Sequence, residues 1–320
     1  MTPGSTSTAP SGIRIVLITT GGTIAAQTTA DGAVPRLSAD DLRPASTRAE
    51  VDTVDLMSVD SSAMTVADQF AIVAAIVEAQ ADPGVDGVVI THGTDTLEES
   101  AYLADLFVTD DRPVVFTGAQ FPADTPASDG PANVEAAFVA ATDPANRGRG
   151  VLVALGGEIR SARGIFKGST THAAAFDNVH DDLPRRRVDH PLSRVRSARV
   201  DTFALYPGVS PGIIAAAVSQ QASGIVLAAT GSGNTHPDIT AEVNAAVRAG
   251  IVVVVTSRVP YGAVDPTYGG GGGAVDLERA GAIVSRWLRA PQARMALLAL
   301  LSTGATADEV REFFRTVGPD

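Results

Sequence analysis

Short runs of apolar residues alternate with longer segments of helical periodicity along most of this chain. The runs are rich in Val, Ile and Leu and lack alternating polar positions, which is typical of strands buried on both faces. Such strands, separated by helices, predict mainly parallel sheets with helices on both sides. We expect strands at 13–18, 87–91, 113–117, 151–155, 200–205, 224–228 and 251–255.

Between these strands, apolar residues recur every three or four positions, which indicates amphipathic helices. Thr65 with Asp68, and Thr306 with Glu309, have the spacing of a capping box, in which the side chains bond the free N–H groups at a helix start. We expect helices at 65–80, 97–107, 132–141, 212–221, 239–249, 291–301 and 307–317.

The alternation stops between Asn178 and Arg199, where prolines and charged residues replace it. We interpret this stretch as the connection between two α/β domains. The larger, N-terminal domain has the mainly parallel sheet with helices on both faces, and the C-terminal α/β domain is smaller. The expected divisions are a disordered tail at 1–12, a catalytic domain at 13–190, a linker at 191–201 and the C-terminal domain at 202–320.

Two biased segments carry further predictions. Arg185, Arg186 and Arg187 form a positive run in an acidic chain, and a solvated face of the connection explains this run better than anion binding does. The glycine run at 269–273 indicates a flexible or tightly turning surface loop.

Composition narrows the classes of partner. The chain has 320 residues, 45% of them hydrophobic, and a formal net charge of −12. An acidic protein repels phosphate backbones and anionic lipids, so we expect neither nucleic acid nor a membrane as partner. The start, Met1–Ser11, lacks the basic and apolar regions of a signal peptide, and no apolar run approaches the ~20 residues of a transmembrane helix. We therefore expect a cytoplasmic protein.

Residue types also limit the chemistry. Cysteine is absent, which excludes disulfides, thiolate metal ligands and a cysteine nucleophile. The histidines show no metal-ligand spacing, so we expect no metal site. Lys167 is the single lysine among 24 basic residues. Lysine can release and regain a proton when desolvated, whereas arginine stays charged. Lys167 is therefore either a chance surface residue or a position that a guanidinium cannot fill.

Glycine and threonine follow three of the expected strands, in the sequences ITTGGTIA (18–25), VITHGTDT (89–96) and VFTGAQ (115–120). The carboxyl ends of parallel strands meet at one edge of a sheet, where ligands bind. Gly21 and Gly22 could form a simple tight turn with nothing bound. A nucleotide-binding turn is a second possibility, but the glycine fingerprints of dinucleotide and P-loop sites are absent. Glycines also let backbone N–H groups approach a substrate oxygen. The adjacent Thr23 is therefore a candidate nucleophile for acyl transfer.

Thr94 and Asp95 add a second hydroxyl and a carboxylate after another strand. Asp95 could instead cap the helix that begins near Leu97. A hydroxyl nucleophile needs a base, and Lys167 is the titratable candidate if the fold brings it close. His92, at the same strand end, is expected to hold its loop by hydrogen bonding.

At these residues the chain resembles a known family. TTGGTIA and VITHGTDTLEE resemble the two signature patterns of the bacterial-type L-asparaginases, the asparaginase/glutaminase family of amidohydrolases. TGAQ, SDGPAN, GIFKGSTTHAAAF, GSGN and TSRVPYGA follow in the matching order, so the similarity covers the chain except its N-terminal tail. The resemblance implies hydrolysis of L-asparagine to L-aspartate and ammonia through a threonine acyl-enzyme, with L-glutamine a weaker substrate and no cofactor.

The resemblance also implies roles for individual residues. Thr23 corresponds to the nucleophile, and the other half of the catalytic group comprises Thr94, Asp95 and Lys167. Substrate-binding positions are Ser58 for the α-carboxylate, Asp95 for the α-ammonium, the backbone near Ala119 for the side-chain amide, and the flanking Gly22 and Gly93. Asn234 corresponds to a residue that reaches toward the site of a neighbouring subunit, which implies a homodimer or homotetramer.

The chain departs from the family pattern at three places. The family usually has a tyrosine shortly after the first signature, on a mobile loop, but 26–42, the expected lid, contains none. We hypothesise that Tyr268, from the partner subunit, supplies this phenol. Val59 replaces a glutamine after Ser58, and Tyr268 with glycines replaces a cross-subunit glutamate. The preference between asparagine and glutamine therefore stays open.

Other functions remain in competition at this point. One is a glutaminase-leaning amidohydrolase, or an amidotransferase subunit that supplies ammonia to a partner. Another is a non-catalytic amino-acid-binding protein, in which the hydroxyls and Lys167 would be dispensable.

Overall fold

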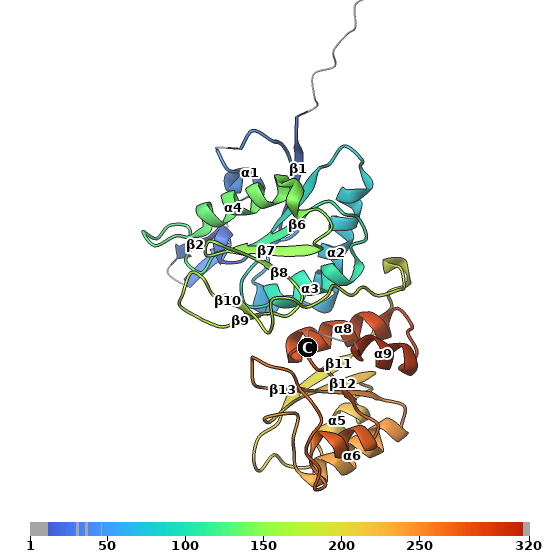
Figure 1. Cartoon of the computed structure of the whole chain (residues 1–320). Helices are drawn as coiled ribbons and strands as arrows, with labels where there is room; N and C mark the ends of the chain where they lie inside the picture. Colours follow the sequence, from blue (N-terminus) through green and yellow to red (C-terminus); the bar gives the residue numbers. More distant parts are fainter. Residues whose placement is uncertain (1–11, 30–31, 36–37, 46, 316–320) are drawn as a thin grey trace, which may run out of the picture.

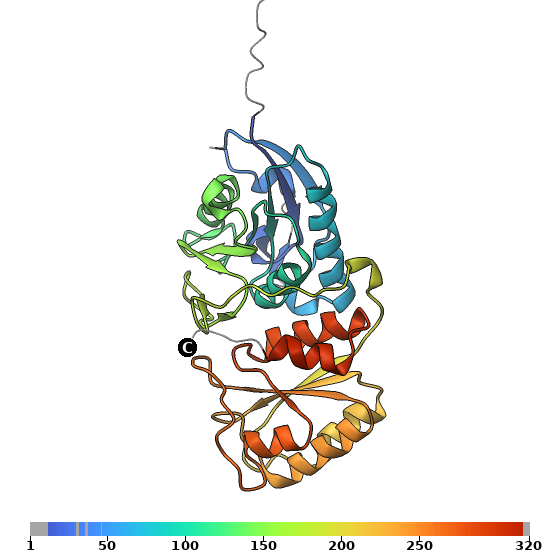
Figure 2. The same cartoon turned by 45° about the vertical axis from the view of Figure 1, so that its right-hand side comes forward.

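In the computed structural model of this protein, residues 12–29, 32–35, 38–45 and 47–315 are described. A larger and a smaller sheet lie one above the other, with the helices α8 (Ala290–Ser302) and α9 (Ala307–Phe314) between them (Figures 1 and 2). The expected tail at 1–12 falls, except for Gly12, outside the described residues. The chain passes from one sheet to the other along 179–199.

The larger sheet has the strand order β4-β1-β5-β6-β7-β8. β8 runs antiparallel to β7, and the remaining pairs are parallel. The strands are β1 (Arg14–Thr19), β4 (Glu50–Asp55), β5 (Gly87–Thr91), β6 (Val114–Thr117), β7 (Val151–Leu155) and β8 (Glu158–Ser161).

This order contains a topological switch point. From β1 the chain moves to one side to form β4, then crosses back to build β5, β6 and β7 on the other side. In open α/β sheets, ligands bind at the carboxyl ends of the two strands where the direction reverses. Here these strands are β1 and β5, which Thr23 and Thr94 follow.

Helices cover both faces of the larger sheet. Ile15 and Leu17 of β1 pack in one core with α4 (Gly130–Thr142), whereas Val16 and Ile18 pack in another core with α2 (Val66–Ala81) and α3 (Leu97–Phe107). Successive side chains of a strand point to opposite faces, so burial on both sides explains the uninterrupted apolar run.

The smaller sheet is parallel and has the order β11-β12-β13-β14. α8 packs on one face and also contacts α3, so one hydrophobic core extends from the larger sheet into the smaller. The other face carries α5, α6 and α7 (Figure 1). The bounds are β11 (Val200–Ala204), β12 (Gly224–Ala229), β13 (Val252–Ser257), β14 (Ile283–Val284), α5 (Ile213–Ser219), α6 (Pro237–Arg248) and α7 (Ala274–Arg279).

Each strand and helix expected from the pattern is present, with ends that shift by up to a few residues within the described chain. The elements that the pattern missed are short or polar. β4 and β14 are edge strands, and β2 (Ala26–Thr29) with β3 (Gly32–Pro35), and β9 (Ile165–Lys167) with β10 (Phe176–Asn178), form antiparallel hairpins. The expected lid at 26–42 is therefore the hairpin β2–β3 followed by the short helix α1 (Ala39–Leu42).

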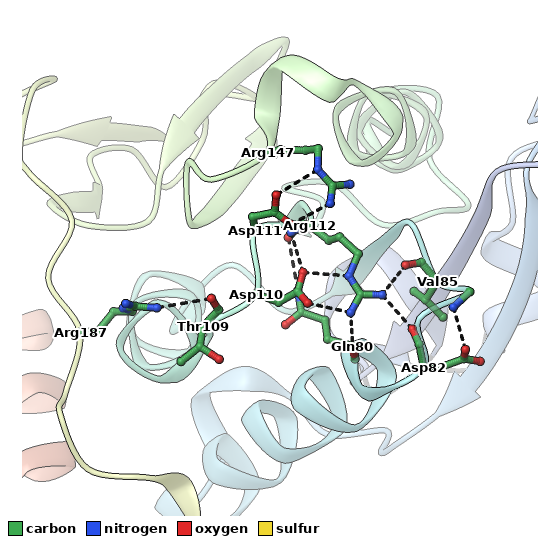
Figure 3. Close-up of polar contacts among 10 residues, drawn as sticks. Gln80, Asp82, Val85, Thr109, Asp110, Asp111, Arg112, Arg147 and Arg187 are labelled. Atoms are coloured by element: carbon green, nitrogen blue, oxygen red, sulfur yellow. Dashed lines mark hydrogen bonds and ion pairs between the residues drawn. The ribbon is translucent and has the colours of Figure 1, made fainter.

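Arg112 forms a cluster of polar contacts near the amino ends of β5 and β6 (Figure 3). Its guanidinium bonds both carboxylate oxygens of Asp110 at 2.8 Å and donates to the carbonyl oxygens of Gln80, Asp82 and Val85. These carbonyls belong to the end of α2 and the turn before β5. Arg112 therefore ties this turn to the segment before β6.

The arginine run after β10 is not simply a solvated face, which corrects the sequence prediction for its first member. Nε of Arg185 lies 2.7 Å from Oδ1 of the buried Asp105 in α3. Arg186 stacks over the ring of Phe313, 5.2 Å from its centroid. The run therefore attaches the interdomain connection to α3 through Arg185 and to α9 through Arg186.

The glycine run forms a tightly turning loop, which is one of the two alternatives that the sequence predicts. The N–H groups of Gly271 and Gly273 both donate to Oδ2 of Asp276, at 2.7 and 3.1 Å. A Cβ on Gly273 would overlap the carbonyl group of Tyr268, and Gly270 and Gly271 have φ values above +90°. At Gly270, Gly271 and Gly273 the backbone path therefore favours glycine.

Candidate active site

The loops after β4, β1, β5 and β6 meet through glycines. A Cβ on Gly21 would lie 2.6 Å from both N and O of Val59, and a Cβ on Gly22 would overlap the backbone of Gly93. A Cβ on Gly118 would lie 2.5 Å from the carbonyl oxygen of His92. Gly21 and Gly22 also have φ of +98° and +82°. The two glycines after the first strand therefore serve two purposes: they permit the turn, and they let the neighbouring loops touch it.

Lys167 completes the site from a distant hairpin. It ends β9, which pairs with β10 beside the larger sheet. Its Nζ lies 2.8 Å from Oγ1 of Thr94 and 2.7 Å from Oδ1 of Asp95. Its side chain is 18% exposed. The chance-surface interpretation of the single lysine is therefore wrong.

Asp95 does not cap α3. The N-cap residue is Thr96, and its Oγ1 donates to the carbonyl oxygen of Ser61 instead of accepting from the helix. Asp95 directs its Oδ1 to Lys167, and its side chain is 59% exposed. Its Oδ2 has no partner among the described residues, so one carboxylate oxygen is open to a ligand.

Glu98 holds the backbone of Lys167 in place. The backbone N–H of Lys167 donates to Oε2 of Glu98 in the first turn of α3. Burial raises the pKa of Glu98 to about 7, although this bond and the positive charge of Lys167 oppose the rise. The sequence signal for Glu98 was its place in the second signature, TDTLEE, but its buried contact is visible only in the fold.

Gln120 also belongs to the site and was missed. Thr94 Oγ1 donates to Oε1 of Gln120 at 2.9 Å. Nε2 of Gln120 donates to the carbonyl oxygens of Ser169 and His172, at 3.2 and 3.1 Å, in the segment that follows Lys167. Its signal in the sequence was its position at a strand end in TGAQ.

Thr23 begins a 3-10 turn, η1 (Thr23–Ala25), and is half-buried. Ile24 is buried behind it in the core of α4, where Gly130 approaches closely: a Cβ there would lie 3.1 Å from Cγ1 of Ile24. Burial of Ile24 in this core therefore anchors the turn that Thr23 begins. Ala119 is buried in the same core, whereas Ser58 is exposed beside Val59, whose N–H bonds the carbonyl oxygen of Thr20 at 3.0 Å.

His92 holds its loop, as predicted. Its Nδ1 lies 2.7 Å from the carbonyl oxygen of Gly93, so this nitrogen carries the proton. Complete burial lowers the pKa of His92 to about 4, against a smaller opposing effect of that bond. The imidazole is therefore neutral at physiological pH and stiffens the loop that carries Thr94.

The two residues predicted to cross a subunit interface lie in the smaller-sheet half. Asn234 follows β12, and its Oδ1 accepts from the N–H of Ala274 at 3.3 Å. Tyr268 is 59% exposed beside the glycine turn. Within one chain, Tyr261 is the tyrosine that contacts the Lys167 hairpin: its hydroxyl donates to Asp177 Oδ2 at 2.6 Å.

The ring of Tyr261 also packs edge-on against Phe166, with centroids 5.4 Å apart. The bond from its hydroxyl is the main cause of the lowered pKa of Asp177. The loop after β13 therefore braces the hairpin that carries Lys167, an arrangement no pattern in the sequence indicated.

Two further properties of the described residues bear on metal binding and on membrane insertion. The described residues contain no group of three or more His, Asp or Glu side chains placed to hold a metal ion. None of the helices within 12–29, 32–35, 38–45 and 47–315 is both long and apolar enough to cross a membrane.

Comparison with known proteins gives the family. Residues 14–191 match the model of the asparaginase N-terminal domain, and residues 199–314 match that of the glutaminase/asparaginase C-terminal domain. An L-asparaginase of Bacillus licheniformis is 33% identical over 310 residues, which covers 91% of this chain and 96% of the relative. A probable L-asparaginase of Deinococcus radiodurans is 34% identical over 319 residues, covering 94% and 97%.

A solved structure agrees. The crystal structure of a probable cytoplasmic L-asparaginase from Campylobacter jejuni superposes with a TM-score of 0.85 at 29% identity, covering 94% of this chain and 99% of that one. The motifs, the fold and the whole-length similarity coincide, so this chain belongs to the asparaginase/glutaminase family of amidohydrolases.

Proposed function

We propose that this protein hydrolyses L-asparagine to L-aspartate and ammonia, with Thr23 as the nucleophile. The proposal rests on one arrangement. The turn after β1 touches the loop after β5, and Thr94 and Asp95 of that second loop contact Lys167. These residue types supply a nucleophile, a proton carrier and a carboxylate at the switch point of the sheet.

In the proposed reaction the oxygen of Thr23 bonds to the carboxamide carbon, and the C–N bond breaks. The departing ammonia gains one proton for the one that Thr23 loses, and Lys167 carries it between them while its Nζ is held by Thr94. Water then attacks the acyl ester, which releases aspartate and restores the Thr23 hydroxyl. No step requires a cofactor.

Substrate selection follows from the charges of asparagine. We infer that the free Oδ2 of Asp95 takes the α-ammonium and that the exposed Ser58 donates to the α-carboxylate. Gly22 and Gly93 allow close approach of the substrate, and the backbone at Ala119 faces the side-chain amide. Val59 offers no polar group to the amino-acid head, which asparagine and glutamine share, so this replacement does not separate the two amides. We expect L-glutamine to be a weaker substrate, as in the family that the motifs resemble.

We further propose a cytoplasmic homodimer or homotetramer in which Asn234 and Tyr268 reach a neighbouring subunit. Nδ2 of Asn234 donates to no acceptor within the described residues, which leaves it available. Tyr268 would supply the phenol that the 26–42 segment lacks, with that segment as the lid. Tyr268→Phe should lower turnover more than Tyr261→Phe, which removes a phenol that is already bonded to Asp177; equal turnover of wild type and Tyr268→Phe contradicts this role.

The decisive experiment measures ammonia release from asparagine and glutamine by wild type and by Thr23→Ala. We expect release from both amides, faster from asparagine, and loss of both in the variant. Faster release from glutamine would favour the glutaminase-leaning alternative. Calorimetric binding of asparagine without ammonia release by wild type would favour a binding protein.

A further inference from the structure

The side-chain amide of Gln120 has an orientation that its neighbours dictate. Its Nε2 lies 3.2 Å from the carbonyl oxygen of Ser169 and 3.1 Å from that of His172, and its Oε1 lies 2.9 Å from Oγ1 of Thr94. Carbonyl oxygens only accept hydrogen bonds, so a flipped amide would set Oε1 against two acceptors. The amide oxygen therefore faces Thr94.

This orientation determines where the Thr94 proton points. The amide oxygen of Gln120 can only accept, so the single hydroxyl proton of Thr94 is donated to it. Oγ1 of Thr94 then accepts from Nζ of Lys167, which lies 2.8 Å away and donates also to Asp95 at 2.7 Å. Donation thus runs in one direction, from Lys167 through Thr94 to Gln120.

The backbone of Gln120 is fixed as well. Its N–H lies 3.1 Å from each carboxylate oxygen of Asp129, and the N–H of Phe121 bonds the same carboxylate at 3.0 Å. Asn133 in turn donates to Asp129 at 3.0 Å. The backbone of Gln120 is therefore held by the Asp129 carboxylate, and its amide is held by two carbonyl oxygens of the segment after Lys167. Fixing both ends of the side chain is what orientation of a catalytic hydroxyl requires.

We propose that Gln120 is a positioning residue that holds the Thr94 proton away from Lys167, so that the lysine faces a hydroxyl able only to accept. This inference rests on the proposed roles of Thr94 and Lys167. Without an acceptor at position 120 the hydroxyl rotates freely, and the single direction of donation is lost.

A double-mutant cycle tests this inference. Gln120→Met keeps the length of the side chain but removes both the acceptor and the donors. We expect its kcat to fall roughly 10- to 100-fold, with a smaller change in KM, because misorientation acts on the chemical step. In a Thr94→Val background, which has no hydroxyl to orient, the same change should cost nothing further. Gln220→Met, at an exposed site, is the matched control.

Two results would overturn the inference: unchanged kcat in Gln120→Met, or an equal loss in the Thr94→Val background. Gln120→Leu also removes the acceptor that faces Thr94, so it serves as the second variant, with the same expected loss of kcat, should Gln120→Met fail to fold. Full activity in Thr94→Val would instead reject the proposed catalytic role of Thr94. If Thr94→Val is inactive while Gln120→Met is fully active, the positioning role of Gln120 is rejected and the proposed catalytic role of Thr94 stands.

Discussion

The side-chain nitrogen of Lys167 lies 2.8 Å from the hydroxyl oxygen of Thr94, a residue 73 positions earlier in the chain. The hairpin β9–β10 brings them together at the carboxyl edge of the larger sheet. A short bond between an ammonium group and a hydroxyl can carry a proton as well as a charge. Substitutions of Lys167 can therefore distinguish proton transfer from the effect of a fixed positive charge.

Lys167→Met should lower turnover by roughly 100- to 10,000-fold, the usual share of a proton-transfer group. Lys167→Arg is the matched variant, because it keeps the positive charge but does not release a proton. We expect both variants to show this loss in steady-state ammonia assays while their circular dichroism spectra match wild type. If Lys167→Arg kept full turnover, Lys167 would act only as a fixed charge.

Gly22→Ala should separate the loops that form the site. The new Cβ would overlap the backbone of Gly93, in addition to the strain of φ at +82°. Gly208→Ala is the control, since Gly208 has φ of +83° but open space around its Cβ position. The positive φ alone costs roughly 1–2 kcal/mol. We expect the midpoint of chemical denaturation and the turnover to fall further in Gly22→Ala than in Gly208→Ala, and similar losses in both would contradict the close loop contact.

Glu98 should make stability depend on pH. Its pKa in the folded chain is raised from 4.5 to about 7 by burial. Between these values the folded chain keeps a proton that the unfolded chain has released, so the free energy of unfolding falls as pH rises through this window. The loss is on the order of 3 kcal/mol and is complete above pH 7. Below pH 4.5 both states are protonated.

Glu98→Gln mimics the protonated side chain and should remove this dependence. Urea denaturation of wild type and Glu98→Gln at intervals from pH 4.5 to 8 would show the variant gaining stability relative to wild type as pH rises. Parallel curves over this range would mean that Glu98 titrates near its ordinary pKa in the fold.

The Arg185–Asp105 pair should contribute to stability far more than an exposed pair does. Asp105 is 3% exposed, and burial raises its pKa even beside Arg185. Arg185→Met leaves a buried carboxyl without its cation and should cost about 3–5 kcal/mol. Arg147→Met is the control, because its bond to Asp111 is solvent-exposed and should contribute about 0–1 kcal/mol. Equal shifts in the unfolding midpoint would contradict the buried pairing.

The sequence by itself determined the alternation of strands and helices in both halves. Burial on both faces leaves an uninterrupted apolar run, as in Val151–Leu155, and local capping fixes starts such as Thr65 with Asp68. The strand-end position of Thr23 and Thr94 followed from the same pattern, because strand ends in a parallel sheet share one edge.

Only the tertiary structure decided which side chains meet. Strand order is set by long-range pairing, so nothing local to β1 shows that it lies between β4 and β5. The polar β9–β10 hairpin has no period to reveal it, yet it brings Lys167 to Thr94. Gln120 and Glu98 acquire their partners through the same folding. Periodicity records which face of an element is buried, whereas the contacts of a polar side chain depend on residues far away in the chain.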